Sequence, residues 1–346
     1  MSSPPESVPS ESTPELTSVS STEAVVHVGP DVRLHRNLTP ATEYQLDGFT
    51  FRTLPTRGPL LTTFATVNDV HFGEEVCGVV SGSNVGPTFR AEAGDDPYPV
   101  VMNRGAVAEM AAIAPAAVVV KGDLTSNGTQ EEYDTFLAMY RTAFGDHVHH
   151  VRGNHESYNH SDLGAVPTQE IVLPGVRLAV LDTSLDGLAT GGVTADQLGW
   201  LDALAAESDR PVIVFGHHHV WDPASSERPP TYFGIRPDDS EALIEVVARR
   251  SAILGYFAGH THRNRVRRFA ATGEVPWVEV ACVKDYPGAW AEYRVHEGGI
   301  LQIFHRISSA PALAWTEKTR HMYEGLYASY AFGTLADRCF EIRPRG

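Results

Sequence analysis

Five short stretches of the chain carry side chains that could bind metal ions, and each stretch follows an apolar run. In chain order these side chains are Asp69 and His71, Asp123, Asn154, His217, and His260 and His262. Open α/β sheets build their sites at the carboxyl ends of strands, so we expect these side chains to meet. Carboxylates, imidazoles and an amide oxygen without a thiolate suit Mn, Fe or Zn better than a cysteine-rich structural zinc site does.

These side chains are too many for one tetrahedral ion. A carboxylate such as Asp123 can bridge two ions, so the set predicts a pair of divalent metals. Two ions about 3.5–4 Å apart are suited to displacement at phosphorus.

The ordered motifs D-x-H, G-D, G-N-H-E, G-H and G-H-T-H resemble those of the calcineurin-like metallophosphoesterase superfamily. The amino-acid sequence of residues 68–73 and 122–128 is most similar to that of bacterial class III cyclic-nucleotide phosphodiesterases. The resemblance runs from about residue 61 to residue 305. It implies a four-layer αββα sandwich of two mixed sheets. It also implies a division of the ligands: Asp69, His71 and His262 for the first ion, Asn154, His217 and His260 for the second, and Asp123 bridging both.

The resemblance implies a metal-dependent phosphodiesterase or phosphatase, in which a hydroxide bridging the ions attacks phosphorus opposite the leaving group. His155 directly follows a ligand and is the best candidate for the general acid, although it could instead only orient the phosphate. Glu156, where close relatives usually carry Asp, is expected to orient Asn154 or His155.

Three further residues are candidates for substrate contact. They are His218, Arg263 and Asn264, of which the last two could equally form a solvated turn.

Cyclic nucleotides or other small phosphodiesters are the expected substrates. A phosphomonoesterase for nucleotides, sugar phosphates or phosphoproteins is the alternative, because the metal pair recognises the phosphoryl group and not the ester. A third possibility is a non-catalytic metal-binding regulatory protein. Purple acid phosphatases, another branch, carry Tyr three residues after the bridging Asp, where this chain has Ser126. A divalent pair is therefore expected here, without ferric–tyrosinate chemistry.

Apolar runs alternate with amphipathic stretches, which predicts parallel strands joined by helices. The predicted strands are 61–67, 116–120, 148–151, 177–181, 212–215 and 253–257, and the predicted helices are 98–114, 129–144, 194–207 and 238–250. Capping boxes at Thr129/Glu132 and Thr194/Gln197 favour two of the helix starts. Three last strands, 277–283, 291–295 and 300–307, suggest an antiparallel end. The long loops 73–97 and 221–237 are expected to affect substrate choice.

The regions outside this pattern are harder to interpret. Residues 1–24 are rich in Ser, Pro and Glu and predict a disordered tail. Residues 25–56 predict a β-hairpin docked on the core. Residues 38–44 also resemble the Tyr corner of a fibronectin-III-like sandwich, but such a domain needs about 100 residues. The metallophosphoesterase domain is expected over 57–310, followed by a C-terminal extension over 311–346.

Composition limits the partners. The 346 residues carry a formal net charge of −16, which disfavours long nucleic acid. Three widely spaced cysteines without a C-x-x-C pair, and the lack of a signal or membrane segment, predict a cytoplasmic protein. The expected partner is a small phosphate ester, and homo-oligomerisation is left open.

Overall fold

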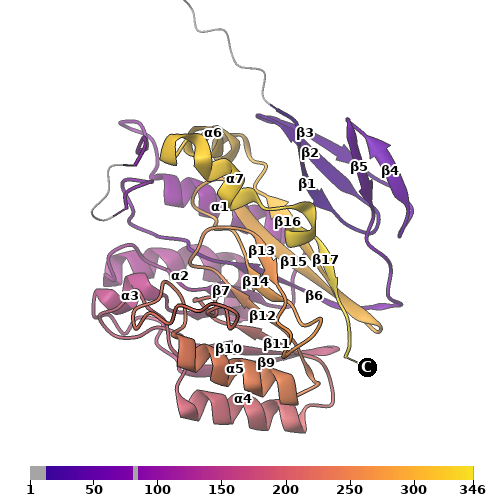
Figure 1. The fold of residues 1–346 in the computed structure, drawn as a ribbon. Helices are drawn as coiled ribbons and strands as arrows, with labels where there is room; N and C mark the ends of the chain where they lie inside the picture. Colours follow the sequence, from indigo (N-terminus) through magenta and orange to yellow (C-terminus); the bar gives the residue numbers. More distant parts are fainter. Residues whose placement is uncertain (1–12, 81–84, 346) are drawn as a thin grey trace, which may run out of the picture.

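Two mixed sheets stacked face to face form the centre of the molecule in the computed structural model, which describes residues 13–80 and 85–345 (Figure 1). In the first sheet the strand order is β17-β16-β15-β6-β7-β8. Strands β6 (Leu60–Val67), β7 (Val118–Lys121) and β8 (Val148–Val151) are parallel neighbours, and β15 (Ala289–His296), β16 (Gly299–Arg306) and β17 (Phe340–Ile342) extend the sheet in antiparallel pairs.

The second sheet has the order β13-β14-β12-β11-β10-β9. Its parallel strands are β10 (Val176–Leu181), β11 (Val212–Phe215), β12 (Ile253–Ala258) and β14 (Trp277–Glu279). Each edge is antiparallel, formed by β9 (Thr168–Leu173) on one side and β13 (Arg265–Arg267) on the other.

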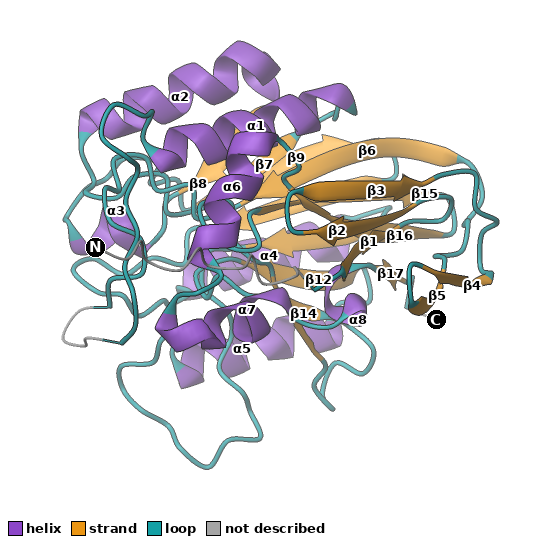
Figure 2. Ribbon diagram, turned by 90° about the horizontal axis from the view of Figure 1, so that it is seen from above, coloured by secondary structure: helices purple, strands orange, loops and turns teal. Residues whose placement is uncertain are grey.

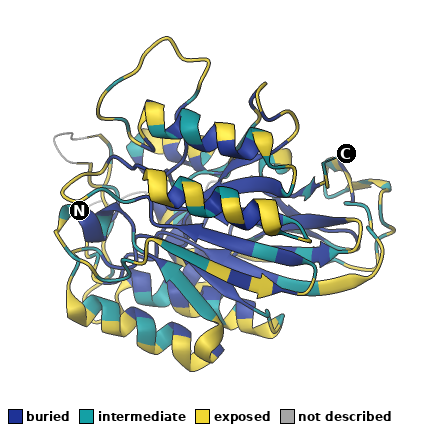
Figure 3. Ribbon diagram, turned by 90° about the horizontal axis from the view of Figure 1, so that it is seen from below, coloured by how far each residue is buried: buried dark blue, intermediate teal, exposed yellow. Residues whose placement is uncertain are grey.

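Helices cover the outer face of each sheet (Figures 1 and 2). Helices α1 (Tyr98–Ala112) and α2 (Gln130–Phe144) pack on the first sheet, and α4 (Ala195–Glu207) and α5 (Pro237–Arg249) pack on the second. Figure 3 shows the result: the strands are mostly buried, and the helices are exposed only on their outer sides. The predicted αββα sandwich is confirmed.

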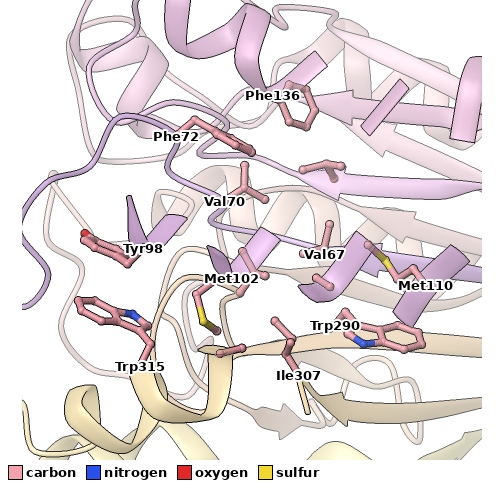
Figure 4. Close-up of a cluster of buried hydrophobic side chains, with 14 of the residues drawn as sticks. Val67, Val70, Phe72, Tyr98, Met102, Met110, Phe136, Trp290, Ile307 and Trp315 are labelled. Carbon is pink, nitrogen blue, oxygen red and sulfur yellow. The ribbon is translucent and has the colours of Figure 1, made fainter. Parts of the chain in front are cut away.

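The central parallel strands β7, β11 and β12 are mostly apolar because both of their faces are buried. Val118 and Val120 of β7 point into the layer beneath α1 and α2, while Val119 points between the sheets. Figure 4 shows the first of these layers, where Met102 and Met110 of α1 lie over Val67. Such alternation of direction follows from the two-residue period of a strand.

The sequence predicted most of these elements to within two residues, and it predicted the Thr194/Gln197 capping box that opens α4. The predicted strand 277–283 is shorter, because the chain leaves the sheet after Glu279. Short elements were not predicted: β9, β13, the 3₁₀ helix η1 (Gly145–His147) and α3 (Asn154–Tyr158).

The N-terminal region corrects two predictions. It forms a three-stranded sheet of β1 (Glu15–Val19), β2 (Ala24–Val28) and β3 (Asp31–His35), and a hairpin of β4 (Glu43–Leu46) and β5 (Phe49–Arg52). The two small sheets share one apolar core, so this region is a small sandwich and not a single docked hairpin. The Tyr44 hydroxyl accepts a hydrogen bond from the Thr39 amide at 2.7 Å, the contact expected of a Tyr corner.

The predicted disordered tail is wrong for residues 15–19, which form β1, while residues 1–12 lie outside the described part of the chain. Leu16 and Val19 are buried, and Glu15 bonds the guanidinium of Arg306 at 3.0 Å and the hydroxyl of Tyr286 at 2.6 Å. A polar composition cannot reveal partners that lie this far away in sequence.

The C-terminal residues belong to the main domain, so no structural boundary falls at residue 310. This segment contains α6 (Ala310–Thr319), the 3₁₀ helix η2 (Tyr323–Gly325), α7 (Leu326–Phe332), α8 (Leu335–Arg338) and β17. Trp315 of α6 stacks on Tyr98 of α1 with ring centres 4.2 Å apart (Figure 4). Within the described residues, no helix combines the length and apolar character needed to span a bilayer.

Candidate metal centre

The side chains predicted as metal ligands lie together beyond the carboxyl ends of five strands, β6, β7 and β8 from the first sheet and β11 and β12 from the second. Ligand atoms lie within 4.8 Å of one another in three overlapping groups: Asp69, His71 and His262; Asp69, Asp123 and His217; and His217, His218 and His260. Asn154 joins them through its Oδ1, which is 2.9 Å from Nε2 of His217. The two sheets thus meet at one cluster.

The backbone turns left-handed at five of these positions. The φ angles are 54° at Asp69, 46° at His71, 50° at Asp123, 67° at His260 and 55° at His262. Alternation along a strand would also turn both members of the D-x-H and H-T-H pairs to one side. It does not act here, because β6 and β12 end before the pairs begin. Left-handed residues other than glycine cost about 1–3 kcal/mol each and concentrate at functional sites.

The motif glycines are required by the ligands' close approach. A Cβ atom at Gly122 would collide with the ring of His217, and one at Gly153 would collide with the carboxylate of Asp123. At Gly259 it would lie 2.7 Å from Oδ2 of Asp69. A side chain at any of these glycines would push a candidate ligand out of place.

One half of the cluster is built around His217, which is fully buried. Its Nδ1 donates to the Lys121 carbonyl at 2.8 Å, so in the neutral ring its Nε2 carries the lone pair. That nitrogen faces Oδ1 of Asn154 at 2.9 Å and Oδ1 of Asp123 at 3.3 Å. Burial alone would lower the pKa of His217, but the Asp123 carboxylate outweighs burial and raises this pKa to about 9. The three atoms therefore favour a positive charge between them, which a proton or a metal ion in its place can supply.

The other half repeats this pattern around His262. Its Nδ1 lies 3.3 Å from Oδ2 of Asp285, and its Nε2 lies 3.4 Å from Oδ1 of Asp69. His71 places Nε2 3.4 Å from Oδ2 of Asp123. Both ring nitrogens of His71 and Nε2 of His260 are buried without a hydrogen-bond partner within the described chain. Buried polar atoms normally have partners, so this donor set fits bound metal ions.

Glu156 supports the turn that carries Asn154. Its carboxylate accepts hydrogen bonds from the Thr125 amide at 2.7 Å, the Thr125 hydroxyl at 2.6 Å and the Gly153 amide at 2.7 Å. Burial, with the nearby Asp123 charge, raises the pKa of Glu156 to about 7. The predicted orienting role is thus corrected in detail: Glu156 ties the backbone before Asn154 to the loop after Asp123.

His155 lines the pocket above the cluster. Its amide donates to Oδ1 of Asp123 at 2.9 Å, and its Nδ1 donates to the Ser126 carbonyl at 2.9 Å. A carbonyl can only accept, so Nδ1 carries a proton and Nε2 is the nitrogen left for exchange with a substrate.

None of the three predicted substrate contacts is among the described residues that line this pocket. His218 is buried beside His217 and His260; its Nδ1 bonds the Thr183 hydroxyl at 2.8 Å, and its Nε2 has no hydrogen-bond partner within the described chain. Arg263 pairs with Glu279 at 2.8 Å. The side-chain amide of Asn264 donates to the Ala331 and Phe332 carbonyls at 3.3 and 3.2 Å. Arg263 and Asn264 therefore make contacts within the fold.

A pocket of about 730 Å³ lies above the cluster. Loop 73–97 contributes Glu74 and Val79 to its lining, and loop 221–237 contributes Phe233. The effect of both loops on substrate choice stays a prediction. Lys284 also lines the pocket, and its Nζ binds Glu74 at 2.6 Å. Burial alone would lower the pKa of Lys284, but the Glu74 carboxylate outweighs burial and raises it well above its usual value.

Sequence reasoning missed Lys284, Asp285 and the tyrosines of the C-terminal segment. The first two follow the apolar run 277–283, which is the same signal that identified the ligands. Tyr323, Tyr327 and Tyr330 have the spacing of one helical face. Such a stripe usually packs in a core, and nothing local distinguishes it from a pocket wall.

The model of one protein family, calcineurin-like phosphoesterase, matches residues 62–264. The chain belongs to the calcineurin-like phosphoesterase family. The match contains every candidate ligand and ends before the C-terminal segment that lines the pocket.

Curated relatives of this calcineurin-like phosphoesterase include two bacterial proteins named for glycerophosphodiesters. A probable glycerophosphodiester phosphodiesterase from Arcobacter nitrofigilis is 27% identical over 166 residues, which cover 43% of this chain and 57% of that protein. The glycerophosphodiester phosphodiesterase of Enterobacter lignolyticus is 30% identical over 161 residues, covering 43% and 56%. A cAMP/cGMP dual specificity phosphodiesterase from Mycobacterium tuberculosis is 27% identical over 161 residues, covering 43% and 49%. The chain thus spans about half the length of these relatives.

Solved structures support the fold. A dimetal phosphatase from Danio rerio aligns with a TM-score of 0.56 at 17% identity, covering 83% of this chain and 100% of that one. A purple acid phosphatase from yellow lupin aligns with a TM-score of 0.50 at 15% identity, covering 81% and 60%.

Proposed function

We propose that this protein is a dinuclear metal-dependent phosphoesterase that hydrolyses small phosphodiesters, with cyclic nucleotides among the candidate substrates. The observation that carries the proposal is the convergence of buried, electron-rich ligand atoms from both sheets beneath an open pocket. The family and the names of the curated relatives support phosphoester chemistry and favour diesters.

The proposed ligands follow the division given above, with Asp123 shared between the two halves. Asp123 suits this role because Oδ1 faces His217 at 3.3 Å and Oδ2 faces His71 at 3.4 Å. Two divalent ions of Mn, Fe or Zn would lower the pKa of water and neutralise charge on the phosphoryl oxygens.

His155 is the proposed proton donor for the leaving group. The Ser126 carbonyl fixes the proton on Nδ1, so protonation of Nε2 gives an imidazolium that can donate into the pocket. The amide of His155 is anchored on Asp123, which holds the ring close to the shared carboxylate. General acid catalysis requires this kind of fixed position near the departing oxygen.

The test is a paired assay on protein loaded with Mn, Fe or Zn. Bis(p-nitrophenyl) phosphate should be hydrolysed with a higher kcat/KM than p-nitrophenyl phosphate, and chelation should remove both activities. A preference for the monoester would favour the phosphomonoesterase. Full metal loading without turnover of either compound would contradict an enzymatic role.

A further inference from the structure

The C-terminal segment supplies one wall of the pocket, although it lies outside the matched family region. Tyr323 of η2 and Leu326, Tyr327 and Tyr330 of α7 all line it. Phe233 lines the same pocket from the loop before α5. The wall is aromatic and aliphatic, in contrast to the histidines and carboxylates below it.

Hydrogen bonds attach this wall to the loop of the last two candidate ligands. The Tyr330 hydroxyl donates to the carbonyl of Thr261 at 3.0 Å, and Thr261 lies between His260 and His262. The backbone amide of Asn264 donates to the Ala331 carbonyl at 2.9 Å. The distance between wall and ligands is therefore set by direct contacts, as a binding surface requires.

The wall also exposes apolar side chains at the pocket. Leu326 is 69% exposed and Phe233 is 57% exposed, and the Phe233 ring centre lies 3.9 Å from that of His260. Single exposed apolar residues are ordinary, but several around one pocket indicate a surface that is covered when a ligand binds.

The pocket has few basic side chains that could bind a second anionic group. Among the described residues that line it, Lys284 is the only lysine or arginine, and Glu74 neutralises it. Arg263, close behind the wall, pairs with Glu279. A substrate with one phosphoryl charge and an uncharged remainder fits this arrangement better than a substrate with several charges.

We propose that η2 and α7 form a subsite for an uncharged, apolar or planar ester group of a monoanionic phosphodiester. This inference rests on the proposed phosphodiesterase function and adds the chemical class of the group that the phosphate carries. A nucleobase and a short hydrocarbon chain share the required apolar surface.

The experiment compares two diesters with the same leaving group, methyl p-nitrophenyl phosphate and phenyl p-nitrophenyl phosphate. The reacting bond is the same, so the ratio of their kcat/KM values, divided by the ratio of their uncatalysed hydrolysis rates, reports the contacts of the second ester group. The wild type should prefer the phenyl compound by about tenfold or more, the range for small apolar differences in a hydrophobic pocket.

Leu326→Ala should reduce this preference several-fold, because the exposed Leu326 lines the proposed subsite and the ratio of the two diesters reports contacts with the second ester group. The matched control is Leu60→Ala. Leu60 is 54% exposed and begins β6, at the end of the strand opposite the metal cluster. The control should keep the wild-type ratio.

Equal turnover of both diesters by wild type, or an unchanged ratio in Leu326→Ala, would refute the subsite and leave the phosphodiesterase function intact. No turnover of either diester by metal-loaded protein would refute both. Two further substrates distinguish the sources of the apolar group: thymidine 5′-(p-nitrophenyl phosphate) carries a base, and hexyl p-nitrophenyl phosphate carries a chain. A preference for either over the methyl compound supports the subsite, and a preference for neither counts against it.

Discussion

The candidate metal centre has a first half around His262 and a second half around His217. The two halves differ in the group that faces Nδ1 of each histidine. In the second half, Nδ1 of His217 donates to a neutral backbone carbonyl, that of Lys121. In the first half, Nδ1 of His262 faces the carboxylate of Asp285 at 3.3 Å. A carboxylate behind a ligating imidazole makes it a stronger donor than a carbonyl does.

The proposed ligands reinforce this difference. Asp69 adds a negative charge to the first half, whereas Asn154 gives the second half a neutral oxygen. Asp285 is held in place by hydrogen bonds from Tyr327 at 2.6 Å and Cys282 at 2.9 Å. The comparison teaches that two adjoining sites on one scaffold can differ in affinity through neighbours that never touch the ion. We expect the first half to bind its ion more tightly.

The largest effect is expected from Asp123→Ala, which should prevent metal binding in both halves of the centre. The shared carboxylate faces both His71 and His217, so its removal takes a negatively charged group from each half. Elemental analysis after dialysis measures the bound metal. Asp162→Ala is the control, because the Asp162 side chain is 98% exposed. Two ions retained by the Asp123 variant would disprove the bridge.

His155→Ala tests a residue that belongs to neither half. We expect kcat to fall by about 10²–10⁴-fold on diesters with poor leaving groups, because protonation of the departing oxygen is lost. Diesters with p-nitrophenolate, which leaves without a proton, should be affected far less. Metal content should equal that of the wild type.

A leaving-group series on both proteins provides this measurement. A uniform loss across the series would make His155 a phosphate-positioning group. Loss of one ion would instead make it a ligand, since His155 also lies in one group with His71 and Asp123.

Asp285→Asn should reduce the difference in metal affinity between the two halves. Removing the charge behind His262 should weaken the first ion by about 10–100-fold, the usual effect of altering a partner behind a ligand. The second ion should bind as before. Calorimetric titration with metal, independent of turnover, measures both affinities.

The mirror experiment is Asn154→Ala, which should weaken the second ion and spare the first. Cys282→Ser is the matched control for Asp285→Asn, because the serine hydroxyl can still donate to the carboxylate. Equal weakening of both ions by Asp285→Asn would show that the halves are not distinguished by this residue.

The smallest effect on the centre is expected from Glu15→Ala, in β1 of the N-terminal sheet. Among the described residues, this change leaves the fully buried Arg306 with Glu317 as its one carboxylate partner, so the free energy of unfolding should fall by about 3 kcal/mol. Both metal affinities should stay at wild-type values. Chemical denaturation gives the stability, and Glu43→Ala, an exposed change in the same region, is the control.

The sequence predicted the parallel strands and the clustered side chains well, because both follow local rules. Strands such as 148–151 and 212–215 were located to the residue, and polar residues after strands identified the candidate ligands that the structure brings together. The left-handed turns at Asp69 and His260 were not predicted, since tertiary contacts hold the backbone there against its own preference.

Long-range contacts explain the other failures. Glu15 lies in a stretch with the composition of a disordered segment, yet Arg306 and Tyr286 hold it in place. Asp285 could have been found, because it follows an apolar run as the candidate ligands do. The tyrosines of α7 could not be assigned, because their spacing fits a buried helix face equally well.

The place of α7 along the chain has a consequence for synthesis on the ribosome. Every candidate ligand precedes residue 263, whereas Tyr330, which bonds the Thr261 carbonyl, comes 68 positions after His262. At about 5–20 residues per second, translation needs several seconds to cover that distance. The nascent polypeptide therefore possesses all of the candidate ligands before the wall that supports them exists. An ion captured during this interval would meet a half-built, more open site, so the order of translation favours metal loading after the chain is released.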